Sequence, residues 1–292
     1  MTSVVFLLVP GLHLLDLAGP AQVFGTAGYD LHYVAEQEDV RSAQGLTMRA
    51  RLDWPDADLI VVPGWRVSPG AGFLTGRTLD RLRAHHDRGG TVASVCAGAD
   101  ALGRAGLLDG RRCTTHHELQ DELAARYPRA TVVRDVLFTV DGRVVTSAGI
   151  ASGIDLSLHL IAAAQGPAAA ARVARAMVVY ARRNGDEQQH SAMLRHRAHL
   201  SDVVHRAQDV IDARFADPLP LAALATSTGV AERTLTRLFR AATGLTPLRY
   251  QQLLRVERAE HLIGQGATVE SAAHATGFAD ARMLRRLRSR PS

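Results

Sequence analysis

Lysine is absent from this chain of 292 residues, so all 34 of its Lys and Arg positions are arginines. The planar guanidinium group of arginine forms paired hydrogen bonds with phosphates and guanine edges, for which a lysine ammonium group is no substitute. We expect the base composition of the genome to be the main cause of this bias. The bias nevertheless supplies side chains that suit a nucleic-acid partner.

Cysteine and long apolar runs are also scarce. The only cysteines are Cys96 and Cys113, and two cysteines in so long a chain exclude a disulfide framework, so a reducing compartment is expected. The apolar run at residues 4–9 has the length of a strand, is too short for a signal-peptide core and follows no basic segment. We therefore exclude a membrane span and expect a cytoplasmic protein.

The length fits two domains, and 47% hydrophobic with 22% charged residues is typical of a globular chain with a sizeable core. The formal charge of +5 is unevenly distributed. Residues 1–165 contain 15 arginines against 18 acidic residues, whereas residues 200–292 contain 13 against 9. The excess of positive charge favours a polyanionic partner for the later part of the chain.

The first half alternates short runs rich in β-branched residues with helical stretches, which is typical of βαβ units and a mostly parallel sheet. Strands are predicted at residues 4–9, 31–35, 59–62 and 91–95, with a helix before Gly89-Gly90. Residues 131–136 and 144–147 flank Asp141-Gly142, which predicts a hairpin. The predicted fold is a doubly wound, flavodoxin-like α/β domain.

The pattern changes after residue 165. An alanine-rich helix is predicted over residues 167–180, and a polar stretch without apolar periodicity follows it. From residue 203 onward the apolar residues recur at helical spacing. We therefore predict a first domain over residues 1–182, a linker over 183–200 and an all-α domain over 201–292.

The all-α part contains the spacing of a helix-turn-helix twice. Ala225 is small enough for two helices to cross, Gly229 suits the tight turn, and Leu235 can pack the second helix against the first. Ala273 and Gly277 repeat this pattern 48 residues later. The sequence therefore predicts two tandem helix-turn-helix units.

A connecting helix is predicted to begin at Thr246-Pro247 and to end at Gly264. Two recognition helices held apart by one rigid helix can enter successive major grooves, about 34 Å apart. In the first unit Leu235 and Phe239 are expected to face inward, which leaves the arginines of that helix on the opposite face.

Residues 200–290 resemble the DNA-binding domain of AraC/XylS-type transcription regulators. The resemblance implies double-stranded promoter or operator DNA as a partner, read by the second helix of each unit. In that family a closing helix usually follows the second unit, whereas this chain ends at Ser292, so the second unit is expected to be held less firmly. The candidate DNA-contacting residues are Arg233, Thr236, Arg237 and Arg240 in the first unit and Arg282, Met283, Arg285 and Arg286 in the second.

The strand predicted at residues 91–95 leads into Cys96-Ala97-Gly98 and an apolar helix. A strand-turn-helix of this kind exposes a nucleophile above the carboxyl edge of a sheet, where open α/β sheets bind ligands. The start of the helix is expected to lower the pKa of the Cys96 thiol.

Together with Asp16, Pro63-Gly64, Thr114-Thr115-His116 and residues 147–155, this elbow resembles the ThiJ/PfpI, class I glutamine amidotransferase-like domain, over about residues 3–180. The combination with an AraC-type domain resembles the GlxA-type regulators, and the nearest enzymes are isonitrile hydratases. Members of this family answer to nitrogen-rich or quaternary-amine metabolites, among others. The residues expected to form an effector pocket are Asp16, Gly64, Trp65, Cys96, Ala97 and His116.

Amide hydrolysis by a cysteine requires a nearby base and an oxyanion hole. Ala97 stands where protease-like members have histidine, residues 147–153 contain no histidine, and Trp65 replaces a glycine beside the expected oxyanion site. We therefore expect a regulator with no catalytic residues, cofactor or metal. The resemblance to PfpI-like domains, which commonly pair, implies a homodimer. Two alternatives stay open: a thiol-dependent hydratase or hydrolase that uses the pair Cys96 and Asp16 and carries a DNA-binding tail, and a module that recruits another protein without reading DNA.

Overall fold

The chain divides into two compact units, Met1–Gln189 and His190–Ser292. Each unit has its own hydrophobic core. A computed structural model describes residues 3–66, 74–179, 183–186, 189, 196–197, 199–264 and 266–288.

The first unit is built on a six-stranded sheet with the order β2-β1-β5-β6-β10-β9. Neighbouring strands are parallel except for β9, which runs antiparallel to β10 at the edge. The parallel part has the flavodoxin-like strand order, which confirms the predicted fold class. The strands are β1 (Ser3–Leu7), β2 (Asp30–Val34), β5 (Leu59–Val62), β6 (Thr91–Val95), β9 (Phe138–Asp141) and β10 (Val144–Ser147).

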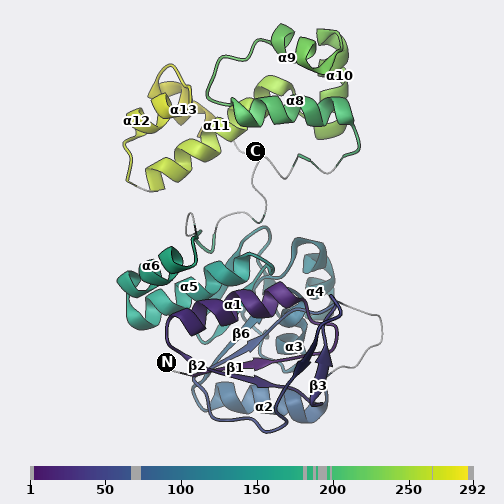
Figure 1. Ribbon diagram of the computed structural model, residues 1–292, viewed down its shortest axis with the longest axis vertical. Helices are drawn as coiled ribbons and strands as arrows, with labels where there is room; N and C mark the ends of the chain where they lie inside the picture. The colour runs from purple at the N-terminus through teal and green to yellow at the C-terminus, as the bar shows by residue number, and fades with distance from the viewer. Residues whose placement is uncertain are drawn as a thin grey trace. The chain divides into compact units, whose positions relative to one another are not determined.

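Helices cover both faces of this sheet (Figure 1). Three of them pack against one another on one face: α1 (Leu14–Thr26), α5 (Ser152–Gln165) and α6 (Pro167–Ala176). On the other face lie α2 (Gly76–Asp87) and α3 (Ala99–Arg104), which also contact each other. Because both faces are covered, every residue of β5 is buried, which explains its continuous apolar sequence.

The predicted hairpin forms, but its first strand was placed too early. Two residues connect Asp141 to its pairing partner Val144, so the strand that pairs with β10 must end at Asp141. Part of the expected strand instead forms β8 (Thr131–Val132), which pairs with β7 (Arg112–Cys113). The remaining small elements are β3 (Asp39–Arg41), β4 (Thr47–Arg49), η2 (His117–Leu119) and α4 (Gln120–Arg126).

The second unit is helical throughout its described elements, as predicted. A first hydrophobic cluster holds α8, α9, α10 and the first half of α11, and a second cluster holds the rest of α11 with α12 and α13. The connecting helix α11 spans both clusters and has the predicted bounds. The helices are α8 (Asp202–Ala213), α9 (Leu221–Thr228), α10 (Glu232–Thr243), α11 (Pro247–Gly264), α12 (Val269–Ala275) and α13 (Ala281–Arg288).

The first described residues of the expected linker bind to the first unit. The backbone N–H of Arg183 donates to Asp155, and its guanidinium group donates to the same carboxylate, whose side chain is buried. The carbonyl of Gly185 accepts hydrogen bonds from the N–H groups of Leu137 and Phe138. This stretch is therefore tied to the edge of the sheet.

Further along the expected linker, Arg197 belongs to the second unit. Its guanidinium group lies 2.7 Å from Asp209 and 2.5 Å from Asp212, both on α8. Tyr180 at the end of the predicted alanine-rich helix, and Ser292 at the end of the chain, lie outside the described residues.

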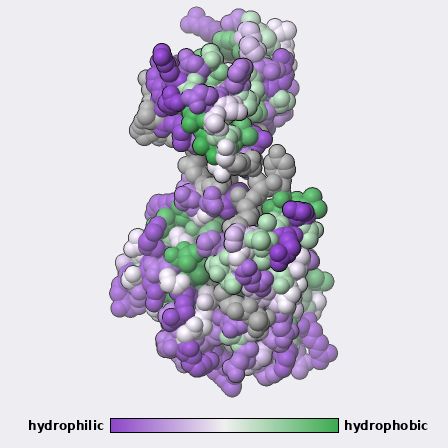
Figure 2. All heavy atoms as spheres, turned by 90° about the vertical axis from the view of Figure 1, so that its left-hand side faces the viewer, coloured by the Kyte–Doolittle hydropathy of each residue, from purple (hydrophilic) through white to green (hydrophobic). Residues whose placement is uncertain are grey.

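Hydrophilic side chains cover most of the face of each unit that Figure 2 shows, with small hydrophobic patches between them. This agrees with apolar side chains being collected in the three clusters. In the part of the chain that the structure describes, no helix has the length and apolar character needed to cross a bilayer.

Candidate functional sites

The elbow at the end of β6 is formed by η1 (Cys96–Gly98), which leads directly into α3. Cys96 has a φ of +54°, in the left-handed region that residues other than glycine seldom adopt. Gly98 is needed for close packing, because a Cβ atom there would lie 2.1 Å from the carbonyl oxygen of Val62. The turn therefore lies tightly against the end of β5.

Three other chain segments converge on Cys96. A Cβ atom on Gly64, just after β5, would lie 2.5 Å from Asp16 Oδ2 and 2.7 Å from Cys96 Cβ. A Cβ atom on Gly149, just after β10, would lie 2.3 Å from Cys96 Cβ. The structure thus brings Asp16, Gly64 and Cys96 together at the carboxyl edge of the sheet, and adds Gly149.

Asp16 is held in place from two sides. Its Oδ1 atom accepts a hydrogen bond of 2.7 Å from the N–H group of Ile150. The start of α1 is fixed because the N–H group of His13 donates to the carbonyl of Gly64 at 2.9 Å. Among the described residues no donor makes a well-formed hydrogen bond to Asp16 Oδ2, although the Cys96 thiol approaches the carboxylate. Burial raises the pKa of Asp16 above its usual value.

The Cys96 thiol is protonated at neutral pH. Burial, followed by the negative charge of Asp16, raises its pKa to about 12, and Glu118 adds to this effect. The expectation that the start of α3 lowers the pKa is therefore wrong. Loss of hydration and two carboxylates outweigh the favourable end of a helix of six residues.

The other expected pocket residues differ in their exposure and contacts. Ala97 and Trp65 are buried, and Trp65 forms an isolated bridge with Leu12. His116 is partly exposed, lies 3.6 Å from Glu118 and has its ring 4.2 Å from that of His117.

Sequence reasoning missed two residues near the elbow. The hydroxyl of Thr115 donates to the carbonyl of Cys96 at 2.8 Å. The side-chain amide of Gln189 donates to the carbonyls of Thr115, at 3.0 Å, and Val136, at 3.1 Å. Thr115 lay in a motif that the sequence singled out, but Gln189 lay in a polar stretch that gave no signal.

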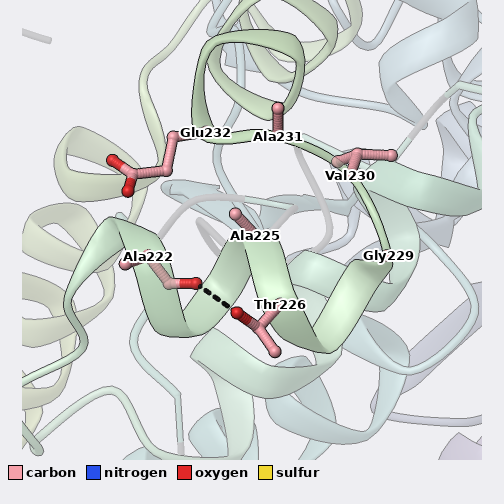
Figure 3. Close-up of a pocket in the computed structure, with 7 residues that line it drawn as sticks. All are labelled: Ala222, Ala225, Thr226, Gly229, Val230, Ala231 and Glu232. Carbon is pink, nitrogen blue, oxygen red and sulfur yellow. Dashed lines mark hydrogen bonds between the residues drawn. The ribbon is translucent and has the colours of Figure 1, made fainter.

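In the second unit, the first helix-turn-helix has the geometry that its spacing predicts. Gly229 ends α9 with a φ of +72°, and Ala225 and Leu235 are buried where α9 and α10 meet. Between α9 and the start of α10 lies an open hollow of about 310 Å³. Figure 3 shows Ala225 pointing into this hollow and Thr226 donating to the carbonyl of Ala222 at 2.9 Å.

The outer face of α10 is rich in free guanidinium groups. Arg233, Arg237 and Arg240 are exposed, opposite the fully buried Leu235 and Phe239. Within the described ranges, none of these three arginines forms an ion pair with a carboxylate. Their charges are thus available to a ligand. The remaining candidate on this helix, Thr236, donates its hydroxyl to the carbonyl of Glu232 at 2.9 Å.

The candidates on α13 are less uniform. Arg282 and Arg286 are exposed, whereas Arg285 lies 2.7 Å from Glu270 of α12. Met283 is only partly exposed because it packs against the second cluster. In the described part of the chain, no group of three or more His, Cys, Asp or Glu side chains could hold a metal ion.

Two family assignments cover most of the chain. Residues 2–163 match the DJ-1/PfpI family, and residues 224–290 match a helix-turn-helix domain. The solved structure of an AraC family transcriptional regulator from Pseudomonas putida is similar to 61% of this chain and to all of its own length, with a TM-score of 0.54 and 25% identity.

Two curated relatives, a regulator and an enzyme, match different shares of this chain. The HTH-type transcriptional regulator GbdR of Pseudomonas aeruginosa is 30% identical over 94% of this chain and 78% of its own length. An isonitrile hydratase of Pseudomonas putida is 38% identical over 53% of this chain and 68% of its own length, so it does not account for the remainder. The regulator spans both units, whereas the hydratase does not, so the comparison does not favour the enzyme alternative. The chain therefore belongs to the AraC-type transcriptional regulators that carry a DJ-1/PfpI domain together with a helix-turn-helix domain.

Proposed function

We propose that this regulator is a cytoplasmic homodimer in which α10 and α13 of each chain read two boxes of double-stranded DNA. A small metabolite bound beside Cys96 changes the affinity for that DNA. The candidate contacts with DNA are the residues of α10 and α13 named above.

The exposed face of α10 carries this proposal. It presents three guanidinium groups that are free of ion pairs among the described residues, on the side opposite the hydrophobic cluster. A guanidinium group bound to a guanine edge contributes about 1–3 kcal/mol of discrimination, whereas one bound to phosphate contributes affinity without sequence information.

A pool of DNA duplexes with a randomised core tests this reading. The full-length protein should enrich a defined motif, and binding should weaken with rising salt. R237A should lose about 5- to 150-fold in affinity if Arg237 contacts a guanine, or reduce the salt slope by about one unit if it contacts a phosphate.

R49A is the matched control, because it removes the same charge from a side chain on β4 of the first unit that is 80% exposed. It should bind the enriched DNA like the unmodified protein. Equal binding by R237A and R49A would show that α10 does not contact DNA. Sedimentation of the protein with and without the enriched duplex tests the dimer, and a monomer in both states would exclude it.

The chemistry around Cys96 favours an effector with N–H donors or positive charge. Asp16 is buried, and one of its oxygens lacks a well-formed hydrogen bond among the described residues. The negative charge of Glu118 also raises the pKa of the thiol. Both are carboxylates, so an anionic ligand would be repelled. The high pKa of Cys96 makes the thiol a poor nucleophile, which supports a binding role rather than catalysis.

A short chain of hydrogen bonds connects this site to the last residue of the first unit. Thr115 binds the carbonyl of Cys96, and Gln189, the last residue of the first unit, binds the carbonyl of Thr115. An effector that moves the elbow would thus act on the segment that continues into the helical unit. It can change DNA affinity only by the difference in its affinity for the two arrangements.

A panel of quaternary amines and amino acids tests the effector site. Compounds that raise the melting temperature of the unmodified protein should also change its affinity for the enriched duplex. D16N should abolish both effects and still bind the duplex. Retention of the melting shift by D16N would place the effector elsewhere.

A further inference from the structure

The helical unit has two hydrophobic clusters, and a polar contact lies where they meet. Helix α11 contributes Tyr250 and Leu254 to the first cluster and Ala259 to the second. Gln251 and Arg255 lie between these positions, one helical turn apart, so their side chains share one face of α11.

The guanidinium group of Arg255 binds both halves of the unit. Toward the first half, its Nε atom donates to the carbonyl of Phe215 at 2.6 Å, and Nη2 donates to those of Ala216 and Asp217 at 3.2 and 2.8 Å. Toward the second half, its Nη1 atom donates to the carbonyl of Gly277 at 2.7 Å. We call these contacts the Arg255 joint.

Neighbouring groups hold the same two segments together. The buried side chain of Gln251 donates to the carbonyls of Phe215 and Asp217 at 2.9 and 2.8 Å. A Cβ atom on Gly277 would lie 1.9 Å from the carbonyl oxygen of Ala216, so the two backbones touch. The ring centroid of Phe278 lies 5.9 Å from Arg255 Cζ. The joint is therefore closely packed.

Each of the two segments that Arg255 binds leads into one of the helix-turn-helix units. Residues 215–217 precede α9 of the first helix-turn-helix, and Gly277 forms the turn before α13. A guanidinium group holds its N–H donors in a fixed plane, so binding both segments fixes their distance and their rotation. Helix α11 also connects the two halves covalently. Because long helices bend, this connection alone does not fix their separation.

We propose that Arg255 is a positioning residue that fixes the separation of α10 and α13 and so sets the spacing between the two DNA boxes. This role rests on the proposed reading of DNA by both helices. Arg255 acts through the two turns and supplies no base contact.

The experiment compares the spacing of boxes that full-length variants enrich from a randomised duplex pool. For each chain, the unmodified protein should enrich a pair of boxes with one dominant spacing within the pair. R255M keeps an unbranched apolar side chain about as long as the arginine chain up to Nε, and it removes all four hydrogen bonds. It should enrich the same bases within each box, but with spacings spread over two or more base pairs. Its affinity for a two-box duplex should fall at least tenfold, while its affinity for a one-box duplex should change less than threefold.

L254A is the matched control, because Leu254 is the buried neighbour of Arg255 in the first cluster and makes no contact in the joint as defined. It should keep the dominant spacing even where it lowers stability. An unchanged spacing with R255M, or an equal loss of affinity for one-box and two-box duplexes, would overturn the positioning role.

Two further results separate this proposal from the proposed function. Enrichment of one box by the unmodified protein would overturn the role of Arg255 and leave DNA binding intact, whereas no enrichment at all would contradict the proposed DNA reading itself.

If circular dichroism shows that R255M does not fold, R255K takes its place. A lysine keeps the charge but cannot span both partners with fixed donors, so it should also broaden the spacing, and the unmodified spacing in R255K would overturn the proposal.

Discussion

The thiol of Cys96 stands at the start of a helix, a position that favours a thiolate when the group is accessible. Here it is 6% exposed and faces the carboxylate of Asp16. Removal of water disfavours the charged form of both groups, and the negative charge of Asp16 further disfavours the thiolate. The thiol is therefore poorly suited to attack a substrate.

Alkylation measures this directly. With a pKa of about 12 instead of the usual 9.0, Cys96 should carry about a thousandfold less thiolate at pH 8 and react with iodoacetamide correspondingly slowly. Its rate should rise about tenfold per pH unit between pH 8 and pH 10. In guanidinium chloride both cysteines should react at the ordinary rate. Rapid modification of Cys96 in the native protein would show that the thiolate is stabilised.

Asp16 predicts a pH dependence of stability. Its pKa is raised in the folded chain, so its contribution to stability is fully present below the unfolded value of 3.8 and is lost as the pH rises through the folded pKa. D16N removes the buried charge. It should raise the melting temperature at pH 7.5, by about 2–4 °C per kcal/mol of relieved burial cost, and the gain should shrink toward pH 4.

D39N is the control for this prediction, because Asp39 is an exposed carboxylate on β3. Its melting temperature should follow that of the unmodified protein at both pH values. A lower melting temperature for D16N at pH 7.5 would show that the hydrogen bond to Ile150 needs the ionised group.

Among the helices and turns, the two helix-turn-helix units use their glycines differently. Gly229 and Gly277 both have a positive φ, of +72° and +79°. A Cβ atom on Gly229 would meet no heavy atom within 4 Å, whereas one on Gly277 would overlap the carbonyl of Ala216. The first glycine is needed for its backbone conformation alone, and the second also for the close approach of two backbones.

This difference predicts unequal effects of alanine. G229A should lower the free energy of unfolding by about 1–2 kcal/mol, the cost of a left-handed alanine. G277A should lower it by about 1–3 kcal/mol more, because the loop at Ala216 must move. Urea unfolding followed by helical circular dichroism compares the two variants. Equal losses would mean that the loop yields freely.

In the whole molecule, the proposed link between effector and DNA would run through the segment that ends the first unit. Hydrogen bonds tie Arg183 to Asp155 on α5, Gly185 to the edge of the sheet and Gln189 to Thr115. The link between effector and DNA is thermodynamically reciprocal, so the factor by which an effector changes DNA affinity is the factor by which DNA changes effector affinity.

Q189L tests the segment as the route of this linkage. It removes the hydrogen bonds to Thr115 and Val136 and leaves the pocket side chains in place. The variant should bind both the effector and the enriched duplex within about threefold of the unmodified protein, while the change in DNA affinity on adding effector falls toward zero. Titrations of labelled duplex with and without effector measure this. An undiminished response would exclude Gln189 from the route.

The sequence predicted the elements whose signals are local. Apolar runs marked β5 and β6, Gly229 marked the turn between α9 and α10, and Thr246-Pro247 marked the start of α11. The first strand of the hairpin was misplaced because the residues next to the turn pair with β10, whatever their apolar content. Gln189 gave no signal because its role depends on carbonyl groups of residues far away in the chain.

The sequence by itself determined the order of strands and helices, the repeated helix-turn-helix spacing and the cysteine at the elbow, because periodicity and turn chemistry act between near neighbours in the chain. Only the tertiary structure decided the protonation of Cys96, the attachment of Gln189 and the joint at Arg255. Each of these depends on burial or on backbone carbonyls that folding brings together from distant segments, and no pattern along the chain records that convergence.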